Sequence, residues 1–78
     1  MEKKYTEKLK EFGLIIRKLR EGKQYSQQEL ADRCEIDIRT IQRIERGDSG
    51  IGLHILFALA EAFEIAPYQL LKSIKWSI

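Results

Sequence analysis

Two helix-start signals lie close together near the middle of the chain. Ser26 and Glu29 form a capping box, in which each side chain can bind a backbone amide at the start of a helix. Asp37 can cap a second helix, and Gly47 is a natural left-handed terminator for it. The first of these helices must end near Cys34, because few residues remain before Asp37. The sequence therefore predicts two short helices joined by a tight turn, the arrangement called helix-turn-helix.

Apolar residues recur every three or four positions on both sides of this unit, as on one face of an amphipathic helix. The stripe before it is Tyr5, Leu9, Phe12, Ile16 and Leu19, and the stripe after it is Leu53, Leu56, Leu59, Ala60 and Phe63. Gly22 is expected to end the first helix, and Pro67 suits the first position of a fifth, although Ala66 lacks a hydroxyl to cap it. That last helix would carry Leu70, Leu71 and Ile74. No segment alternates with a period of two, so the expected fold class is all-α.

The length of the chain leaves room for one small domain. With 78 residues we expect a single core, and a chain this short buries only about 60% of its unfolded surface. Cys34 is the only cysteine, which excludes an internal disulfide and a multi-thiolate metal site and fits a reducing cytoplasm. No signal peptide or membrane-length apolar run is apparent. We therefore expect one cytoplasmic domain over residues 1–78, with no metal and no membrane partner.

The positive charges are distributed unevenly. The net charge is only +2, yet all six arginines lie between Arg17 and Arg46, whereas residues 48–64 contain no lysine or arginine. In the second helix of the central pair, Ile41 and Ile44 should point into the core. The residues left toward solvent are Ile38, Arg39, Gln42, Arg43 and Arg46. Repulsion among these arginines costs roughly a few tenths of a kcal/mol per pair. DNA phosphates would offset it, and guanidinium groups can pair with guanine in the major groove.

From residue 12 to residue 71 the sequence resembles the helix-turn-helix domain of the phage 434 and lambda repressors and Cro, in the Xre-type family of bacterial regulators. The matching text is "IRKLRE" (16–21), "SQQELA" (26–31), "TIQRIERG" (40–47) and "LHILFALAEAFEI" (53–65). The resemblance implies a compact five-helix bundle in which residues 38–46 form the recognition helix. Residues 26–47 would be the helix-turn-helix core, and helices four and five, over residues 53–75, would complete the core and form a dimer.

The resemblance also implies roles for single residues at the matching positions. The candidate base contacts are Ile38, Arg39, Gln42 and Arg43. Gln27 matches a family glutamine that touches a phosphate and supports the recognition helix. Arg20 and Glu45 match an ion pair between two helices, which we interpret as structural because such a pair adds specificity of packing more than net stability.

Two further groups are candidates for phosphate contacts. Arg46 lies near the end of its helix, where a cation either offsets the helix dipole or reaches a backbone phosphate. The loop over residues 47–52 contains three glycines, which let backbone amides such as those of Ser49 and Gly50 approach a phosphate closely. This loop lacks the basic side chains of some relatives, so a plain flexible loop is an equal alternative.

The same residues also have structural interpretations. Exposed arginines are commonly just solvated, and Ile38 can be surface scatter or part of the core rather than a contact for a thymine methyl. Gln27 can be a neutral residue at a helix start. Gln24 and Glu35 depart from the family pattern, which commonly has glycine or asparagine there for left-handed backbone. We expect strain at these two positions or slightly different turns.

No residue pattern predicts an enzyme. Cys34 and His54 are the only conceivable nucleophile and base, and they lack an orienting carboxylate and oxyanion donors. We expect Cys34 to fill a small buried site and His54 to lie on the solvent side of its helix. A redox-sensing thiol is the alternative for Cys34. The expectation is no catalysis, no cofactor and no small-molecule substrate.

The chain contains more apolar residues than one small core needs. Those outside the stripes are Leu14, Ile15, Ile55, Phe57, Tyr68, Trp76 and Ile78. In the family, symmetric dimers form through the fifth helix and its flanks, so the candidates for a dimer interface are Ile55, Tyr68 and Trp76. A two-fold dimer would place two recognition helices about 34 Å apart on a near-palindromic site.

The expected function is sequence-specific binding of double-stranded DNA by a homodimer that represses or otherwise regulates transcription. The alternative from another class is a protein-interaction module or antitoxin component that uses the same fold, with DNA binding secondary. A prophage repressor, an autoregulating antitoxin and a restriction-modification controller all suit a chain of this size. The sequence does not separate them.

Overall fold

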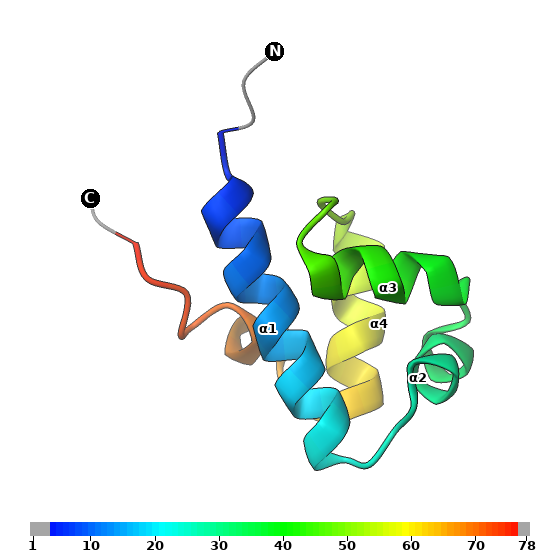
Figure 1. Cartoon of the computed structure of the whole chain (residues 1–78). Coiled ribbons are helices and arrows are strands. Elements are labelled where there is room, and N and C mark those ends of the chain that lie inside the picture. The colour runs from blue at the N-terminus through cyan, green and yellow to red at the C-terminus, as the bar shows by residue number, and fades with distance from the viewer. Residues whose placement is uncertain (1–3, 77–78) are drawn as a thin grey trace.

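The structure, a computed structural model, describes residues 4–76, and its regular elements are all helical (Figure 1). In chain order these elements are α1 (Thr6–Gly22), α2 (Gln27–Cys34), α3 (Ile38–Arg46), α4 (Leu53–Phe63) and the 3-10 helix η1 (Pro67–Leu70). The predicted all-α class and the central pair of short helices are therefore present. No helix among these residues is both long enough and apolar enough to cross a membrane. Ile78 lies outside the described residues.

The central pair begins where the capping residues stand. Ser26 Oγ accepts a hydrogen bond from the Glu29 amide at 3.0 Å, and the Glu29 carboxylate accepts one from the Ser26 amide at 2.8 Å. The bond from the Ser26 amide lowers the pKa of the Glu29 carboxyl, because it favours the charged form. Asp37 accepts a bond from the Arg39 amide at 3.0 Å at the start of α3. Side-chain caps thus fix both helix starts.

All four α-helices are followed by a residue in the left-handed region. These residues are Gln24 (φ 62°), Glu35 (φ 56°), Gly47 (φ 75°) and Glu64 (φ 60°). In each turn the next amide reaches back to a carbonyl five residues earlier, as Tyr25 does to Arg20 at 3.0 Å. Gly22 ends α1 as expected, but Gln24 makes the turn. Three of the four turns therefore carry a side chain where glycine is less strained.

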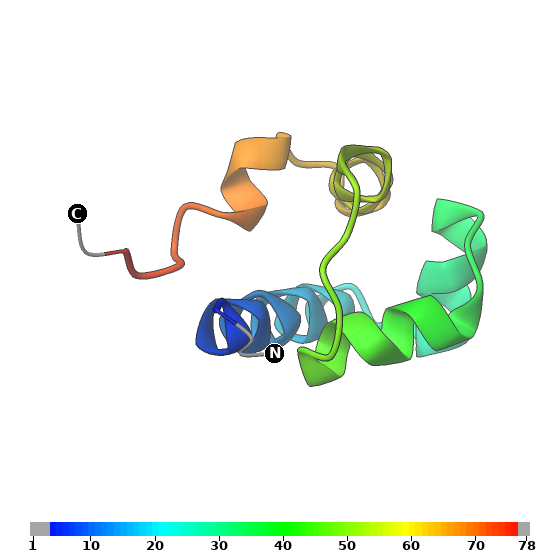
Figure 2. The same cartoon turned by 90° about the horizontal axis from the view of Figure 1, so that it is seen from above.

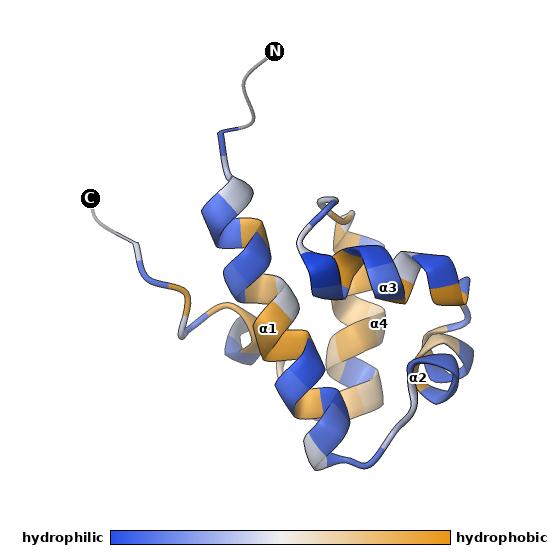
Figure 3. Cartoon of the chain, in the orientation of Figure 1, coloured by the Kyte–Doolittle hydropathy of each residue, from blue (hydrophilic) through white to orange (hydrophobic). Residues whose placement is uncertain are grey.

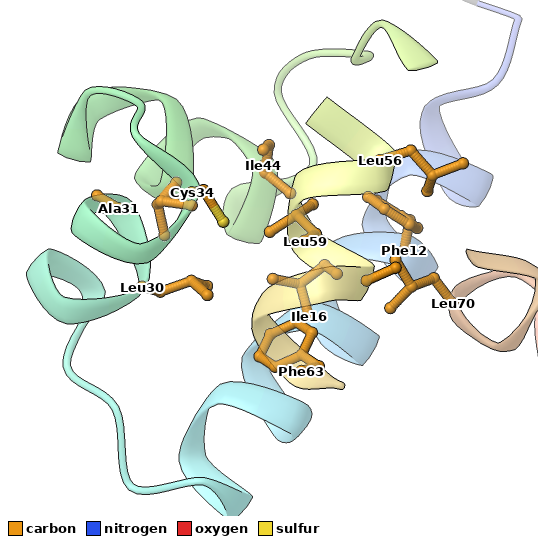
Figure 4. Close-up of a cluster of buried hydrophobic side chains, with 12 residues drawn as sticks. Phe12, Ile16, Leu30, Ala31, Cys34, Ile44, Leu56, Leu59, Phe63 and Leu70 are labelled. Carbon is orange, nitrogen blue, oxygen red and sulfur yellow. The ribbon is translucent and has the colours of Figure 1, made fainter. Parts of the chain in front are cut away.

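The helices form two layers with the core between them. In the view from above, α1 and α3 lie on one side and α4 and η1 on the other (Figure 2). The buried side chains are Phe12, Ile16, Leu30, Ala31, Cys34, Ile41, Ile44, Leu56, Leu59, Ala60, Phe63 and Leu70 (Figure 4). Tyr5, Leu53 and Leu71, which the apolar stripes placed in the core, are exposed instead. Each of them lies at or beyond the end of its helix.

The predicted fifth helix is wrong, and with it the five-helix bundle: the described chain has four α-helices and only a 3-10 turn at residues 67–70. Ala66 has no side-chain acceptor for the first amides, and the Gln69 side chain accepts from the Ala66 amide at 2.9 Å instead. The chain then makes short turns, with bonds from Leu71 to Tyr68 and from Ile74 to Leu71. Residues 71–76 follow as a turn-rich segment beside α1 (Figure 1).

Two glycines bring α1 and the end of α3 into backbone contact. A Cβ atom on Gly13, in the middle of α1, would lie 2.4 Å from the Ile44 carbonyl oxygen and 2.7 Å from that of Glu45. A Cβ atom on Gly47 would lie 2.8 Å from Lys10 Cα. All three distances are too short for a side chain to fit. The position of α3 on α1 therefore depends on the absence of side chains at these two sites.

We predict that Gly13→Ala destabilises the protein although alanine is the better helix former. The added methyl meets rigid backbone, and overpacking of this kind costs about 1–3 kcal/mol even after the gain in helix propensity. Gly22→Ala is the matched control, because a Cβ atom there meets no other atom within 4 Å. Urea denaturation should show a loss for the first variant and none for the second. Equal stability of the two variants would contradict the close contact.

We predict that Glu35→Gly stabilises the protein by about 0.5–1 kcal/mol, because relief of the left-handed strain exceeds the added entropy of the unfolded chain. Lys18→Gly, at an exposed position inside α1, is the control and should lose about 1 kcal/mol. Thermal denaturation tests whether the stability rises in Glu35→Gly and falls in Lys18→Gly. A loss of stability at both positions would show that residue 35 is not strained.

Candidate nucleic-acid interface

Helix α3 has one buried and one exposed side. Ile41 and Ile44 are fully enclosed, as their spacing predicted, and they hold α3 on the core. The arginines Arg39, Arg43 and Arg46 are exposed. Figure 3 shows the hydrophilic colour of α3 on the side that faces the viewer, away from α4. The outer side of α3 is thus a polar, cationic surface.

Two of these arginines have no partner within the part of the chain that the structure describes. The side chains of Arg39 and Arg43 form no hydrogen bond, ion pair or ring contact there. Every other arginine in residues 4–76 has one: Arg17, Arg20 and Arg46 pair with carboxylates, and Arg33 stacks over the Tyr25 ring at 4.3 Å. The free pair is four residues apart, on successive turns of one helix face.

The other two candidate base contacts are less exposed. Ile38, the first residue of α3, is half-buried and packs against the edge of the core. Part of its apolar surface is therefore already used inside the protein. Gln42 is also half-buried and lies between the two free arginines in sequence. The structure brings the four candidates together on α3, and their contact with bases stays a prediction.

A partly buried polar network joins the first three helices. Arg20 on α1 donates two hydrogen bonds to the Glu45 carboxylate on α3, at 2.6 and 3.1 Å, and a third to the Tyr25 carbonyl at 2.9 Å. Only 12% of the Arg20 side chain and 5% of the Glu45 side chain are exposed. The bonds to Glu45 raise the pKa of Arg20, so its charge is secure. This ion pair is the one that the family resemblance implied.

Gln27, the first residue of α2, completes the network. Its side-chain amide donates to the Glu45 carboxylate at 3.1 Å. The Gln27 side chain therefore supports α3 directly, and it is half-buried while doing so. Its role in phosphate binding stays a prediction.

The remaining phosphate candidates lie at the end of α3. Arg46 pairs with Asp48 at 2.8 Å, and both side chains are exposed. In the loop that follows, Ser49 is half-buried and Gly50 is exposed. A Cβ atom on Gly50 would meet no other atom within 4 Å, so the fold itself does not require glycine there.

A polar groove of about 510 Å³ lies between α1 and α3. We call it the α1–α3 groove, and its lining residues are Arg17, Arg20, Gln27, Gln42, Glu45 and Arg46. Arg17 was not among the site residues predicted from the sequence. Its position three residues before Arg20, and so on the same face of α1, is the signal that could have indicated it.

The dimer candidates lie on α4, on η1 and in the segment after η1. Ile55 on α4 is half-buried and packs on the core, whereas Tyr68 is 65% exposed. Trp76 is 58% exposed although it stacks with Tyr5, with ring centroids 6.2 Å apart. Lys8 Nζ lies 5.3 Å from the centroid of the same ring. Trp76 is therefore partly engaged within its own chain.

Cys34 and His54 differ in their surroundings, as the sequence predicted. Cys34 is buried, and its loss of solvation raises the pKa of the thiol, the opposite of what a redox-sensing thiolate needs. His54 is exposed on α4. Within residues 4–76, no group of three or more histidine, cysteine, aspartate or glutamate side chains is placed to hold a metal ion.

Several known proteins share this arrangement. A family profile described as helix-turn-helix, HTH_3, matches residues 16–70. The restriction-modification controller protein C.AhdI from Aeromonas hydrophila is 35% identical, with 80% of this chain and 94% of that chain covered and a TM-score of 0.77. The hypothetical transcription factor NHTF from Neisseria is 33% identical, with 81% and 72% covered and a TM-score of 0.76. No curated protein matches the chain.

The fold alone is also shared with a more distant structure. The clp gene regulator ClgR from Corynebacterium glutamicum is 20% identical, with 83% of this chain and 69% of that chain covered and a TM-score of 0.78.

We predict that removing one partner of the Arg20–Glu45 pair destabilises the protein more than removing both partners. Glu45→Met leaves the Arg20 charge buried with only the Tyr25 carbonyl, and single losses in buried pairs cost about 3–5 kcal/mol. The double variant Arg20→Met/Glu45→Met should be more stable than Glu45→Met, because no unpaired charge remains. Denaturant unfolding of the three proteins measures the difference. Additive losses in the double variant would contradict a buried, coupled pair.

Proposed function

Because the chain belongs to the HTH_3 family of helix-turn-helix proteins, the Xre-type transcription regulators, we propose that it binds double-stranded DNA sequence-specifically through α3. The observation that carries the proposal is the pair of free arginines. Arg39 and Arg43 are exposed on one face of α3 and have no partner within the described residues. An arginine without an internal partner keeps its whole guanidinium fork available for a ligand.

The major groove is the site that fits this face. A single α-helix enters the major groove, and arginine pairs there with the O6 and N7 atoms of guanine in two parallel hydrogen bonds. Arg39 and Arg43 would read bases in this way, with Gln42 between them able to contact adenine. The exposed part of Ile38 lies at the start of α3, where it would reach a thymine methyl.

Phosphate contacts would fix α3 in the groove. Our candidates are Gln27, Arg46, Ser49 and Gly50. Arg46 would exchange its exposed partner Asp48 for a phosphate, and exposed ion pairs of this kind contribute only about 0–1 kcal/mol. Gln27 stands at the start of α2, where the helix dipole favours an anion.

We further propose that the chain acts as a homodimer on a near-palindromic operator. Exposed large apolar side chains support this, since Phe57, Tyr68 and Trp76 lie on α4, η1 and the segment after it, leaving α3 free. Ile55, Tyr68 and Trp76 are the proposed interface residues. The two recognition helices would then lie about 34 Å apart, on successive turns of the duplex.

The biological role that we favour is that of a restriction-modification controller. The 35% identity to C.AhdI over most of both chains supports it over a prophage repressor or an antitoxin. We propose a cytoplasmic, non-enzymatic regulator in which residues 1–78 form one domain. Repression of its own operon is the expected action.

A protein-interaction module with the same fold is the second candidate. The exposed apolar side chains Phe57, Tyr68 and Trp76 favour it, because they would suit a partner other than a second copy. The free arginines distinguish the two candidates, since an interaction module has no need of Arg39 and Arg43.

We predict that DNA binding weakens steeply with salt and that Arg43→Ala relaxes base discrimination. Each phosphate contact makes the slope of log affinity against log salt steeper by about 0.9.

In the Arg43→Ala variant, loss of a bidentate base contact should cost about 1–3 kcal/mol of discrimination at one or two base pairs. Selection of duplexes from a random pool, followed by fluorescence anisotropy, measures both effects.

Arg33→Ala is the matched control for this experiment. Arg33 is an exposed arginine on α2, so its loss removes the same charge without touching α3. It should leave the preferred sequence unchanged. Equal loss on all sequences for Arg43→Ala would assign Arg43 to phosphates, and a flat salt response would contradict DNA binding altogether.

A further inference from the structure

The α1–α3 groove adjoins the proposed DNA-binding face of α3. Gln42 and Arg46 belong both to the lining of the groove and to the side of α3 that is turned away from the core. The opposite wall comes from α1, through Arg17 and Arg20. A duplex lying on α3 would therefore bring one strand of its backbone to the mouth of this groove.

The lining residues divide into engaged and exchangeable groups. Arg20 and Gln27 both donate to the Glu45 carboxylate, so these three side chains are already engaged with one another through Glu45. Among residues 4–76, Arg17 is held only by Glu21, at 3.3 Å, and both side chains are more than half exposed. Exposed pairs are weak, because water and salt screen them. A phosphate can therefore displace Glu21 from Arg17, as it can displace Asp48 from Arg46.

We propose that the α1–α3 groove binds a DNA backbone phosphate and that Arg17 on α1 is a contact residue of this site. The proposal rests on the proposed function and extends it to a helix outside the helix-turn-helix unit. Arg17 on α1 and Arg46 on α3 bind the phosphate from the two sides of the groove. The planar guanidinium group of each arginine can donate two parallel hydrogen bonds to the phosphate oxygens.

The loop after α3 gives a second reason for a contact from α1. Residues 47–52 contain Asp48 and no lysine or arginine, so this loop offers backbone amides and the Ser49 hydroxyl but no cation. Arg17 supplies the cation that the loop lacks. The backbone of the duplex is thus held from α1 and the end of α3.

The test compares Arg17→Ala with Lys18→Ala in the full chain. Lys18 is the next residue on α1, is equally cationic and exposed, and does not line the groove. Fluorescence anisotropy is measured over a range of salt concentrations on a selected operator duplex and on a random duplex of the same length. Arg17→Ala should weaken binding about three- to tenfold on both duplexes and lower the salt slope by about 0.9. Lys18→Ala should leave the slope within error of the original chain.

The carboxylate that holds Arg17 provides an independent readout. Glu21→Gln releases Arg17, so it should tighten binding about two- to fivefold. The gain should exceed that of Glu61→Gln, which removes the same charge from α4, outside the groove. In the Arg17→Ala background the advantage of Glu21→Gln over Glu61→Gln should disappear, because no guanidinium is left to release.

The outcomes separate this proposal from the proposed function. If the original chain binds no duplex, the proposed function fails. If it binds, but Arg17→Ala and Lys18→Ala weaken binding equally, the groove is not a phosphate site and only this proposal falls. A loss confined to the operator duplex would also overturn it, since a phosphate contact acts on every sequence. Thermal denaturation should show unchanged folding, because both residues are exposed.

Discussion

The close backbone contact between α1 and α3 is the constraint on which the rest of the structure depends. Gly13 and Gly47 remove the side chains that would separate the two helices, and the Arg20–Glu45 ion pair joins the same two elements. Gln27 adds a bond from α2, so three helices share one carboxylate. Ile41 and Ile44 fill the core side of α3. With its inner side fixed in this way, α3 can present only its outer side to a ligand.

The arginines show how one residue type performs different tasks in this chain. Arg20 is partly buried and paired with Glu45, and it positions α3. Arg17 and Arg46 are exposed and held by single carboxylates, so a phosphate can replace their partners. Arg39 and Arg43 have no internal partner in residues 4–76 and are the ones we assign to bases. The proposed role of each arginine thus corresponds to how strongly its guanidinium group is already bound by partners within the chain.

Local signals allowed the central pair of helices to be predicted, because capping is a property of a few neighbouring residues. Ser26, Glu29 and Asp37 cap as expected. The fifth helix was wrong, since Pro67 suits a helix start but Ala66 offers no cap, and only a 3-10 turn forms. The sequence also could not reveal why α1 has a glycine at position 13, because the reason is a carbonyl group of α3, on Ile44, that is thirty-one residues away. Glu64 likewise gave no sign of its left-handed backbone.

The most direct test of the central claim is a nuclear magnetic resonance titration of the isotope-labelled chain with a selected duplex. If α3 enters the major groove, the side-chain signals of Arg39 and Arg43 and the backbone amides of α3 should shift most, while the core methyl groups of Ile41 and Ile44 change little. Shifts centred on α4 and residues 67–76, with the arginine signals of α3 unchanged, would contradict the account.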